Sequence, residues 1–256
     1  MTDFRFHELT KEDGVAKIVL NRPKHNVFNI DMMQELTQLL ADLDKDKDLK
    51  CLVISGKGAS WCAGVEVGDH SPELAPEMIR VFDLLLKQIE NMAVPTIAAV
   101  HGACLGGGME VAIACDMVVG STAAVFGQPE IKLGFFPPYA AVRLPHLVGP
   151  AKAVEICTTG RRYTAEAMFR MGLLADLFEA DAFDAGIAAL IKEICQCSPL
   201  IIRLNKQAVN RHLNMTPDAA MKSVNDMFLN ELMKTEDTQE GLNSFAEKRR
   251  AVWVNR

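Results

Sequence analysis

Two glutamates stand where a carboxyl group could transfer protons. Glu110 follows three consecutive glycines and precedes the apolar stretch 111–114, and Glu130 follows Pro129 in a short run of apolar and restricted residues. Such surroundings exclude water, which raises the pKa of a carboxyl group toward the range used in acid–base catalysis. The alternative to a catalytic role is that Glu130 is an ordinary solvated surface residue. The same alternative explains Glu110 less well, because glycines and apolar residues flank it.

Two glycine-containing loops could supply backbone hydrogen-bond donors near these carboxyl groups. Gly106-Gly107-Gly108 lies between an expected strand and an expected helix, where free N–H groups favour a phosphate or an oxyanion. A phosphate loop would continue with Lys and Ser or Thr, but Met109-Glu110 follows here, so a polarised carbonyl is the better ligand. The second loop spans residues 60–66. Tight packing for the first loop, and a plain strand-to-helix connection for the second, are the alternatives.

The composition excludes several classes of protein. The chain has 256 residues, 49% hydrophobic and 23% charged, which suits one large domain or one domain with a small appendage. A net charge of -6 disfavours nucleic-acid binding. The seven cysteines form no paired CxxC motifs, so we expect reduced thiols and no metal site. Neither a signal peptide nor a membrane-spanning run is visible, and we therefore expect a cytoplasmic protein that binds no membrane.

Apolar periodicity predicts strands and helices that alternate over the first half of the chain. Strands are expected over 15–20, 52–54, 96–100 and 117–119, and helices over 32–43, 79–89 and 110–115. Asp31 is a candidate cap for the first helix, and Pro150, Pro199 and Pro217 mark later helix starts. This order indicates an α/β protein. We expect a core over residues 1–195 that holds the active site and a helical region over 196–256.

Taken together, the motifs resemble the crotonase (enoyl-CoA hydratase/isomerase) family over nearly the whole chain. The matching segments are Asn21-Arg22-Pro23 with Asn26 and Asn29, residues 61–66, 100–102, 105–110, Cys115-Asp116, 126–130 and Leu133-Gly134. The resemblance implies an α/β fold in which β-β-α units wind into a spiral, followed by a C-terminal helical region. It also implies trimers, often stacked into hexamers, and a coenzyme A thioester as the substrate, with no separate cofactor.

The resemblance further assigns roles to individual residues. It places Glu110 and Glu130 at the acid and base positions of the hydratases, in an order it does not fix. The N–H groups of Val65 and Gly107 would form an oxyanion hole for the thioester carbonyl. Further contacts with the thioester would come from Ala63, Val65, Glu66, Val67, Gly68 and Gly107. Phe245 and Lys248 match a C-terminal pair that touches the CoA nucleotide of a neighbouring subunit.

One segment departs from the common hydratases, which carry a glycine-rich turn after the second glutamate. Here the sequence is Gly134-Phe135-Phe136-Pro137-Pro138-Tyr139. Together with residues 66–72, it looks more like the cyclohexa-1,5-diene-1-carbonyl-CoA hydratases of anaerobic benzoyl-CoA degradation. We therefore expect 1,4-addition of water to a cyclic dienoyl-CoA, with Phe135, Phe136 and Tyr139 walling a compact pocket. Packing of these aromatic residues in the core or at a subunit contact is the alternative.

Three other functions are weighed against this one. The first is a short-chain 2-enoyl-CoA hydratase of β-oxidation. The second is a non-catalytic acyl-CoA-binding or interaction protein on the same fold, which would be expected to lack a catalytic glutamate or an oxyanion glycine. The third is a nucleotide-binding domain built on Gly106-Gly107-Gly108, which lacks the lysine and the spaced glycines of such sites. His70 and His101 could face a site, but a structural role is favoured for each.

Overall fold

A computed structural model of the protein describes residues 4–211 and 215–256. Its larger sheet has six strands in the order β1-β2-β3-β5-β7-β10. The first two are antiparallel, and every other neighbouring pair is parallel. The strands are β1 (His7–Glu12), β2 (Val15–Leu20), β3 (Cys51–Gly56), β5 (Thr96–Val100), β7 (Met117–Ser121) and β10 (Asp176–Phe178).

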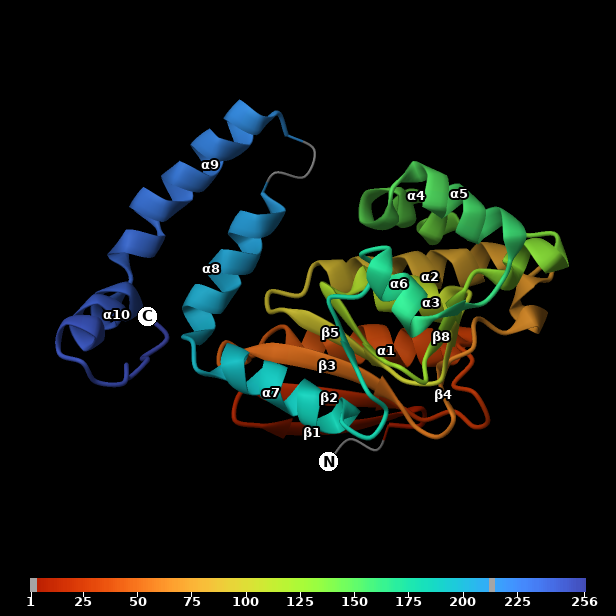
Figure 1. Ribbon diagram of the computed structural model, residues 1–256, viewed down its shortest axis with the longest axis horizontal. Helices are drawn as coiled ribbons and strands as arrows, with labels where there is room; N and C mark the ends of the chain where they lie inside the picture. The colour runs from red at the N-terminus through yellow and green to blue at the C-terminus, as the bar shows by residue number, and fades with distance from the viewer. Residues whose placement is uncertain (1–3, 212–214) are drawn as a thin grey trace.

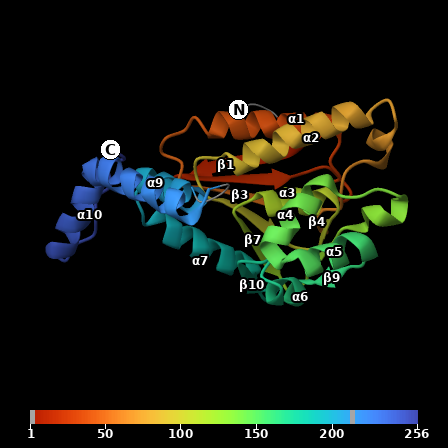
Figure 2. The same cartoon turned by 90° about the horizontal axis from the view of Figure 1, so that it is seen from above.

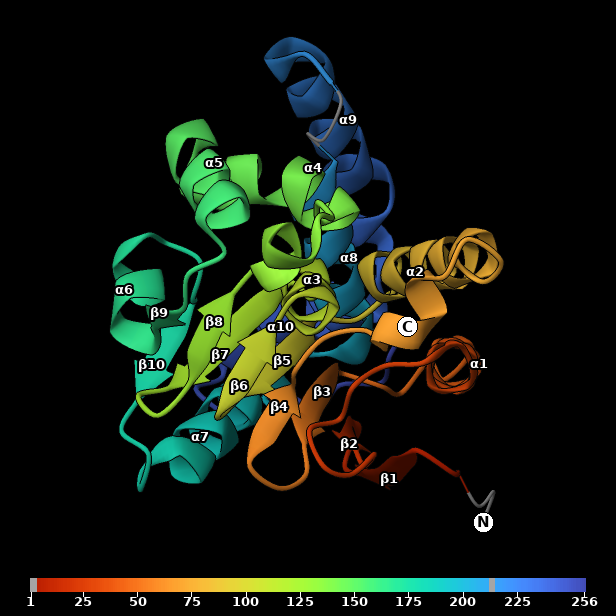
Figure 3. The same ribbon diagram turned by 90° about the vertical axis from the view of Figure 1, so that its right-hand side faces the viewer.

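A smaller sheet of four strands, in the order β4-β6-β8-β9, lies beside the first (Figure 3). Its strands are β4 (Ser60–Cys62), β6 (Ala103–Leu105), β8 (Val125–Gly127) and β9 (Tyr163–Thr164). Three times the chain adds a strand to the large sheet, then a strand to the small sheet, then a helix. The helices are α2 (Ala75–Glu90), α3 (Gly107–Ala114) and α4 (Pro138–Val148). This repeat confirms the predicted spiral of β-β-α units.

The two faces of the large sheet are covered by different helices, because successive side chains of a strand point to opposite faces. Leu52 and Ile54 of β3 pack into the cluster that contains α1 (Ile30–Leu43) and α2. Cys51 and Val53 pack instead against α7 (Phe183–Cys195). Figure 2 shows α1 and α2 on one side of the strands and α7 on the other. All seven cysteines are free thiols, and four of them are buried.

The start of α1 corrects one prediction from the sequence. The side chain that caps the helix is that of Asn29, whose Oδ1 accepts a hydrogen bond from the Met32 N–H at 3.0 Å. Asp31 lies in the first helical turn, so its assignment as the cap was wrong. Both residue types favour this position, and only the backbone turn decides between them. The predicted start of a helix at Pro217 is confirmed in α9, where the Thr216 side chain caps the first turn.

The C-terminal helices leave the core and form an extended arm (Figure 1). After α5 (Pro150–Thr159), α6 (Ala165–Arg170) and α7, the chain bends by 100° into α8 (Pro199–Asn210). The arm continues with α9 (Pro217–Asn230), the 3-10 turn η3 (Leu232–Lys234) and α10 (Glu236–Ala246). Two further 3-10 turns lie earlier in the chain, η1 (Val67–His70) and η2 (Pro129–Leu133). Lys206 of α8 ties the arm to the core through an ion pair with Asp116 at 2.6 Å.

In the described part of the chain, no single helix is both long enough and apolar enough to cross a membrane; only the bent pair α7–α8 passes, on length and composition alone.

Candidate active site

The loop after β4 is held so that one backbone donor is left free. Phe28 N–H donates to Gly64 O at 2.9 Å, and Glu66 N–H donates back to Phe28 O at 2.7 Å. Because these two bonds flank Val65, its own N–H points to the other side of the segment. Upstream, the buried Asn26 amide donates to the carbonyls of Lys57, Ser60 and Trp61 and fixes the approach to this loop.

Each of the three consecutive glycines is required by a different close neighbour. Gly106 has φ +55, and a Cβ there would lie 2.8 Å from Glu130 Oε1. A Cβ on Gly107 would meet Val65 Cγ2 at 2.5 Å, and one on Gly108 would meet Cys62 O at 2.4 Å. The glycines are therefore required for tight packing, which was the alternative to a ligand-binding role. The same packing brings the glycine loop against Val65 and Glu130.

The two predicted oxyanion donors are both available. Within residues 4–211 and 215–256, neither the Val65 N–H nor the Gly107 N–H has a hydrogen-bond partner. Gly107 is the first residue of α3, where the helix leaves its N–H groups unsatisfied. Because Val65 packs directly against Gly107, the two free donors lie on neighbouring backbone segments, as an oxyanion hole requires.

Glu110 is nearly enclosed, with only 3% of its surface exposed. It lies in the first turn of α3, and its Oε1 accepts a hydrogen bond from Ala140 N–H at 2.8 Å. That donor belongs to the first turn of α4, so the N-terminus of one helix orients the carboxyl group of another. Burial raises the pKa of Glu110 to about 7, and the charge of Glu130 adds to the effect, against the hydrogen bond from Ala140.

Glu130 occupies the 3-10 turn η2, with its carboxyl group against Gly106. In the amide orientation that satisfies both side chains, the fully buried Gln128 donates to Glu130 Oε1 and Oε2 at 3.1 Å each. Burial raises the pKa of Glu130 to about 7 as well. The sequence predicted a raised pKa for Glu130, and the direction is confirmed. In addition to burial, the charge of Glu130 therefore contributes to the raised pKa of Glu110, while the shift of Glu130 itself comes from burial.

Both carboxyl groups face one cavity of about 380 Å³. The predicted residues Ala63, Val65, Val67 and Gly107 line it too, and so do Phe135, Phe136, Pro137 and Pro138. The remaining lining is almost entirely apolar: among the described residues, His70 is the only polar side chain besides Glu110 and Glu130. An apolar cavity with a few convergent polar groups suits a small apolar substrate that reacts at one point.

Some predicted residues do not line this cavity. Glu66 forms an ion pair with Arg22 at 3.1 Å, and Gly68 faces open space. Tyr139 does not wall the cavity as expected, because its hydroxyl donates to Glu90 Oε1 at 2.7 Å and its ring packs against the core. The sequence predicted Phe135, Phe136 and Tyr139 together in the pocket because all three are aromatic. The start of α4 at Pro138 turns Tyr139 away from it.

Two residues of the site were not predicted. His70 was given a structural role, yet it lines the cavity. The signal available in the sequence was its position, two residues after Gly68 and shortly after the loop that carries Val65. Gln128 was noticed only as part of a motif. Nothing in the sequence shows that its amide is fully buried beside Glu130, since this depends on how η2 folds onto the glycine loop.

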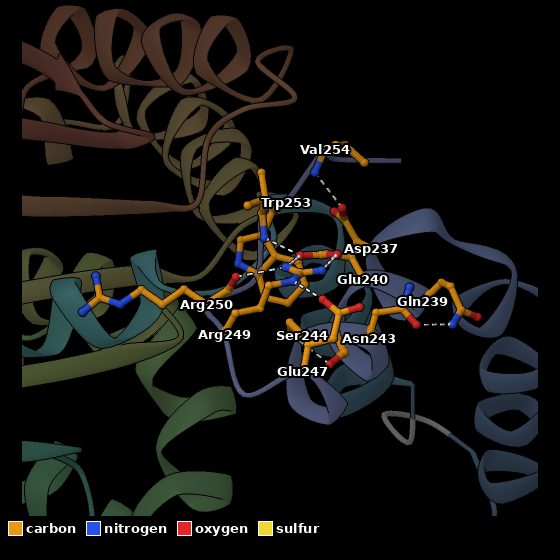
Figure 4. Close-up of polar contacts among 12 residues, drawn as sticks. Asp237, Gln239, Glu240, Asn243, Ser244, Glu247, Arg249, Arg250, Trp253 and Val254 are labelled. Carbon is orange, nitrogen blue, oxygen red and sulfur yellow. Dashed lines mark hydrogen bonds and ion pairs between the residues drawn. The ribbon is translucent and has the colours of Figure 1, made fainter.

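Phe245 and Lys248 lie far from this cavity, at the end of α10. The Phe245 side chain is 87% exposed. A polar network folds the tail back on the arm (Figure 4): Glu240 accepts from Arg249 and from Val252 N–H, and the buried Asp237 accepts from Val254 N–H at 2.7 Å. The network holds the α10 end in place, with Phe245 facing outward.

Comparisons with known proteins agree with this geometry. A profile described as enoyl-CoA hydratase/isomerase matches residues 10–256. The cyclohexa-1,5-dienecarbonyl-CoA hydratase of Thauera aromatica is 31% identical, covering 97% of this chain and 96% of the relative. The crotonyl-CoA hydratase of Syntrophomonas wolfei is 33% identical, covering 97% of each chain. The structure of Pseudomonas aeruginosa DspI superposes with a TM-score of 0.93 at 29% identity, covering 99% of this chain and 98% of that one.

Proposed function

Because this chain belongs to the enoyl-CoA hydratase/isomerase family and is an enoyl-CoA hydratase-type lyase, we propose that it hydrates a cyclic, conjugated dienoyl-CoA thioester. The proposed reaction converts cyclohexa-1,5-diene-1-carbonyl-CoA to 6-hydroxycyclohex-1-ene-1-carbonyl-CoA, a step of anaerobic benzoyl-CoA degradation. The observation that carries the proposal is the wall formed by Phe135, Phe136, Pro137 and Pro138 beside the two carboxyl groups. Prolines restrict the backbone, so this wall suits a compact ring better than a long flexible chain.

The oxyanion hole activates the substrate in this proposal. With the thioester oxygen between the N–H groups of Val65 and Gly107, negative charge that arrives from the double bond is stabilised. One such donor contributes on the order of 3 kcal/mol in enzymes where it has been removed. This role is supported by the way the two donors are held, because Phe28 fixes the loop that carries the Val65 N–H and α3 fixes the Gly107 N–H.

Glu110 and Glu130 would move the protons. One carboxylate takes a proton from water as the oxygen bonds to the ring carbon β to the thioester carbonyl, and the displaced π electrons form a dienolate. The other, protonated carboxyl group then gives its proton to the far carbon of the second double bond, which leaves one ring double bond and completes the addition of one water. Since both pKa values are raised to about 7, charged and neutral forms coexist near neutral pH.

A short-chain 2-enoyl-CoA hydratase is the second candidate. It is favoured by the crotonyl-CoA hydratase of Syntrophomonas wolfei, which is as similar to this chain as the Thauera aromatica dienoyl enzyme. The same carboxyl pair would serve, with the proton delivered to the α-carbon. The non-catalytic alternative is disfavoured, because Glu110, Glu130 and both free N–H groups are present together.

The remaining parts of the proposal concern assembly and binding. We propose that Phe245 and Lys248 touch the CoA nucleotide of a neighbouring subunit in a trimer or hexamer. Residues 196–256 would form the region responsible for this contact and for assembly. The protein would act in the cytoplasm without a cofactor or a metal ion. The support is the outward position of Phe245, far from the cavity of its own chain. Glu66 and Gly68 would contact the thioester outside the cavity.

A substrate comparison tests the proposed function. Purified protein is assayed with cyclohexa-1,5-diene-1-carbonyl-CoA and with crotonyl-CoA, and the loss of the conjugated chromophore gives kcat/KM for each. We expect a preference for the cyclic thioester of at least about tenfold, the range in which a hydrophobic pocket distinguishes related substrates. A preference for crotonyl-CoA would support the second candidate and reject the first.

A further inference from the structure

His70 has no part in the chemistry described above, although it lines the same cavity as the two carboxyl groups. It ends the 3-10 turn η1, which follows directly on the loop that carries Val65. In the part of the chain that the structure describes, His70 and the two glutamates are the only polar side chains that line the cavity, so the histidine needs an explanation.

The ring of His70 stands on a firmly held support. Its Nδ1 is 3.0 Å from Glu66 O, the geometry of an N–H donor to a carbonyl. The turn itself is tied to α1, because Asp69 Oδ2 accepts from Ile30 N–H at 3.1 Å. With Nδ1 occupied by the backbone, the ring cannot swing out of the cavity without losing that bond.

His70 contacts Phe135, which lines the same cavity. The two ring centroids are 5.1 Å apart with an interplanar angle of 43°, a favourable tilted arrangement. Phe135 comes from the segment after η2 and is itself held by its N–H, which donates to Glu130 O at 3.1 Å. Two segments that are far apart in sequence therefore meet at the His70–Phe135 pair.

The His70–Phe135 pair belongs to the partly exposed part of the cavity lining. His70 is half-buried and Phe135 is 41% exposed, whereas Glu110 is enclosed. Because the two rings are in contact, an acyl group that ends before the pair fits inside, and a longer one that reaches the pair has to displace one of the rings. We infer that the His70–Phe135 pair determines specificity by limiting the length of the acyl group. This inference rests on the proposed function only in placing the acyl part of a thioester in the cavity.

Two substitutions at His70 separate the stacked ring from the backbone hydrogen bond. His70→Phe keeps an aromatic ring against Phe135 but cannot donate to Glu66 O. His70→Asn keeps an N–H donor near the Nδ1 position but has no ring. The measured quantity is kcat/KM for trans-2-decenoyl-CoA divided by kcat/KM for crotonyl-CoA, so that a general loss of activity or folding cancels.

We expect His70→Asn to raise this ratio by at least about tenfold, as the loss of a barrier in an apolar pocket would, and His70→Phe to leave it within about twofold. Phe135→Ala should raise it to the same extent, and adding His70→Asn to Phe135→Ala should raise it no further, because one barrier is removed either way. Any other pattern overturns the inference. Both test substrates are linear, so failure here is distinct from failure of the ring-substrate proposal.

Discussion

The cavity and the end of α10 hold the two halves of the predicted site in opposite surroundings. In the cavity, Glu110 is 3% exposed and fixed by the first turn of α4. On α10, Phe245 is 87% exposed, and the contacts around it serve to hold the tail. The first region has both proposed acid–base groups and both free backbone donors within one chain. The second presents groups that reach nothing in the same chain's cavity.

This difference indicates a division of work. Enclosure raises the pKa values of carboxyl groups and strengthens backbone donors, and these effects act on the transition state. Exposed groups such as Phe245 and Lys248 can add affinity for a remote part of the substrate. Changes in the cavity should therefore lower kcat, and changes on α10 should raise KM. The experiments below test that division, from the largest expected effect to the smallest.

Replacing either carboxyl group should have the largest effect. Glu110→Gln and Glu130→Gln preserve size and some hydrogen bonding but cannot exchange a proton. Each should lower kcat by about 100- to 10,000-fold, with an unchanged circular dichroism spectrum and little change in thioester affinity. Stopped-flow assays give kcat, with cyclohexa-1,5-diene-1-carbonyl-CoA or crotonyl-CoA, whichever the wild-type protein prefers. If one variant turned over at a near-native rate, the residue concerned would not be an acid or a base.

Separating the two oxyanion donors should come next. In Gly107→Ala the new methyl group would lie 2.5 Å from Val65 Cγ2, so the two loops must move apart. Loss of one aligned donor lowers kcat by about 100- to 1,000-fold in other enzymes, and we expect a similar loss here. Gly241→Ala on α10 is the control, because its nearest neighbour would be Trp253 at 3.7 Å. Equal kinetics for the two variants would show that the contact between the loops is unimportant.

The pH dependence of stability should reveal the enclosure of Glu110 directly. Its folded-state pKa of about 7 exceeds the unfolded value of 4.5, so the folded protein binds more protons between these values. Stability should thus fall as pH rises from about 4.5 to about 7, on the order of 3 kcal/mol for this group. Urea denaturation of wild type and Glu110→Gln at pH 5 and pH 8 isolates the contribution. If the difference between the two proteins stayed constant with pH, the carboxyl group would not be enclosed as described.

The smallest effect is expected on α10. Lys248→Ala removes one exposed cation, and we expect KM for the CoA thioester to rise about tenfold, the value of one charge-assisted hydrogen bond, with kcat unchanged. The same variant should lose little with the 3′-dephospho-CoA thioester. Lys192→Ala, an exposed lysine on α7, is the matched control. A fall in kcat instead would place Lys248 in the chemical step.

Local sequence patterns predicted the elements that carry the site. Strand 15–20 and strand 96–100 were predicted with their observed ends, because short, mostly apolar runs bounded by polar or proline positions leave few alternatives. The spiral order came only from the resemblance, since periodicity says nothing about which sheet a strand joins. Asp31 was predicted as the cap of α1 in place of Asn29, because both side chains can cap a helix and only the backbone turn decides between them.

Long-range contacts explain what the sequence could not provide. Glu110 depends on Ala140, and Glu130 on Gln128, and only the fold brings α4 and η2 to the glycine loop. His70 and Phe135 meet across 65 positions of the sequence for the same reason. Tyr139 was expected in the cavity because its type matched its neighbours, but a helix that begins at Pro138 gives adjacent side chains different directions.

The central claim is that the cavity of one chain holds the reacting part of a CoA thioester between two backbone donors and two carboxyl groups. A crystal structure of the protein with the hydroxyacyl-CoA product bound tests this most directly. The account predicts the thioester oxygen within about 3 Å of both the Val65 and Gly107 nitrogens, and the product hydroxyl within hydrogen-bonding reach of Glu110 or Glu130. A thioester oxygen that contacts neither nitrogen, or an acyl group outside the cavity, would contradict it.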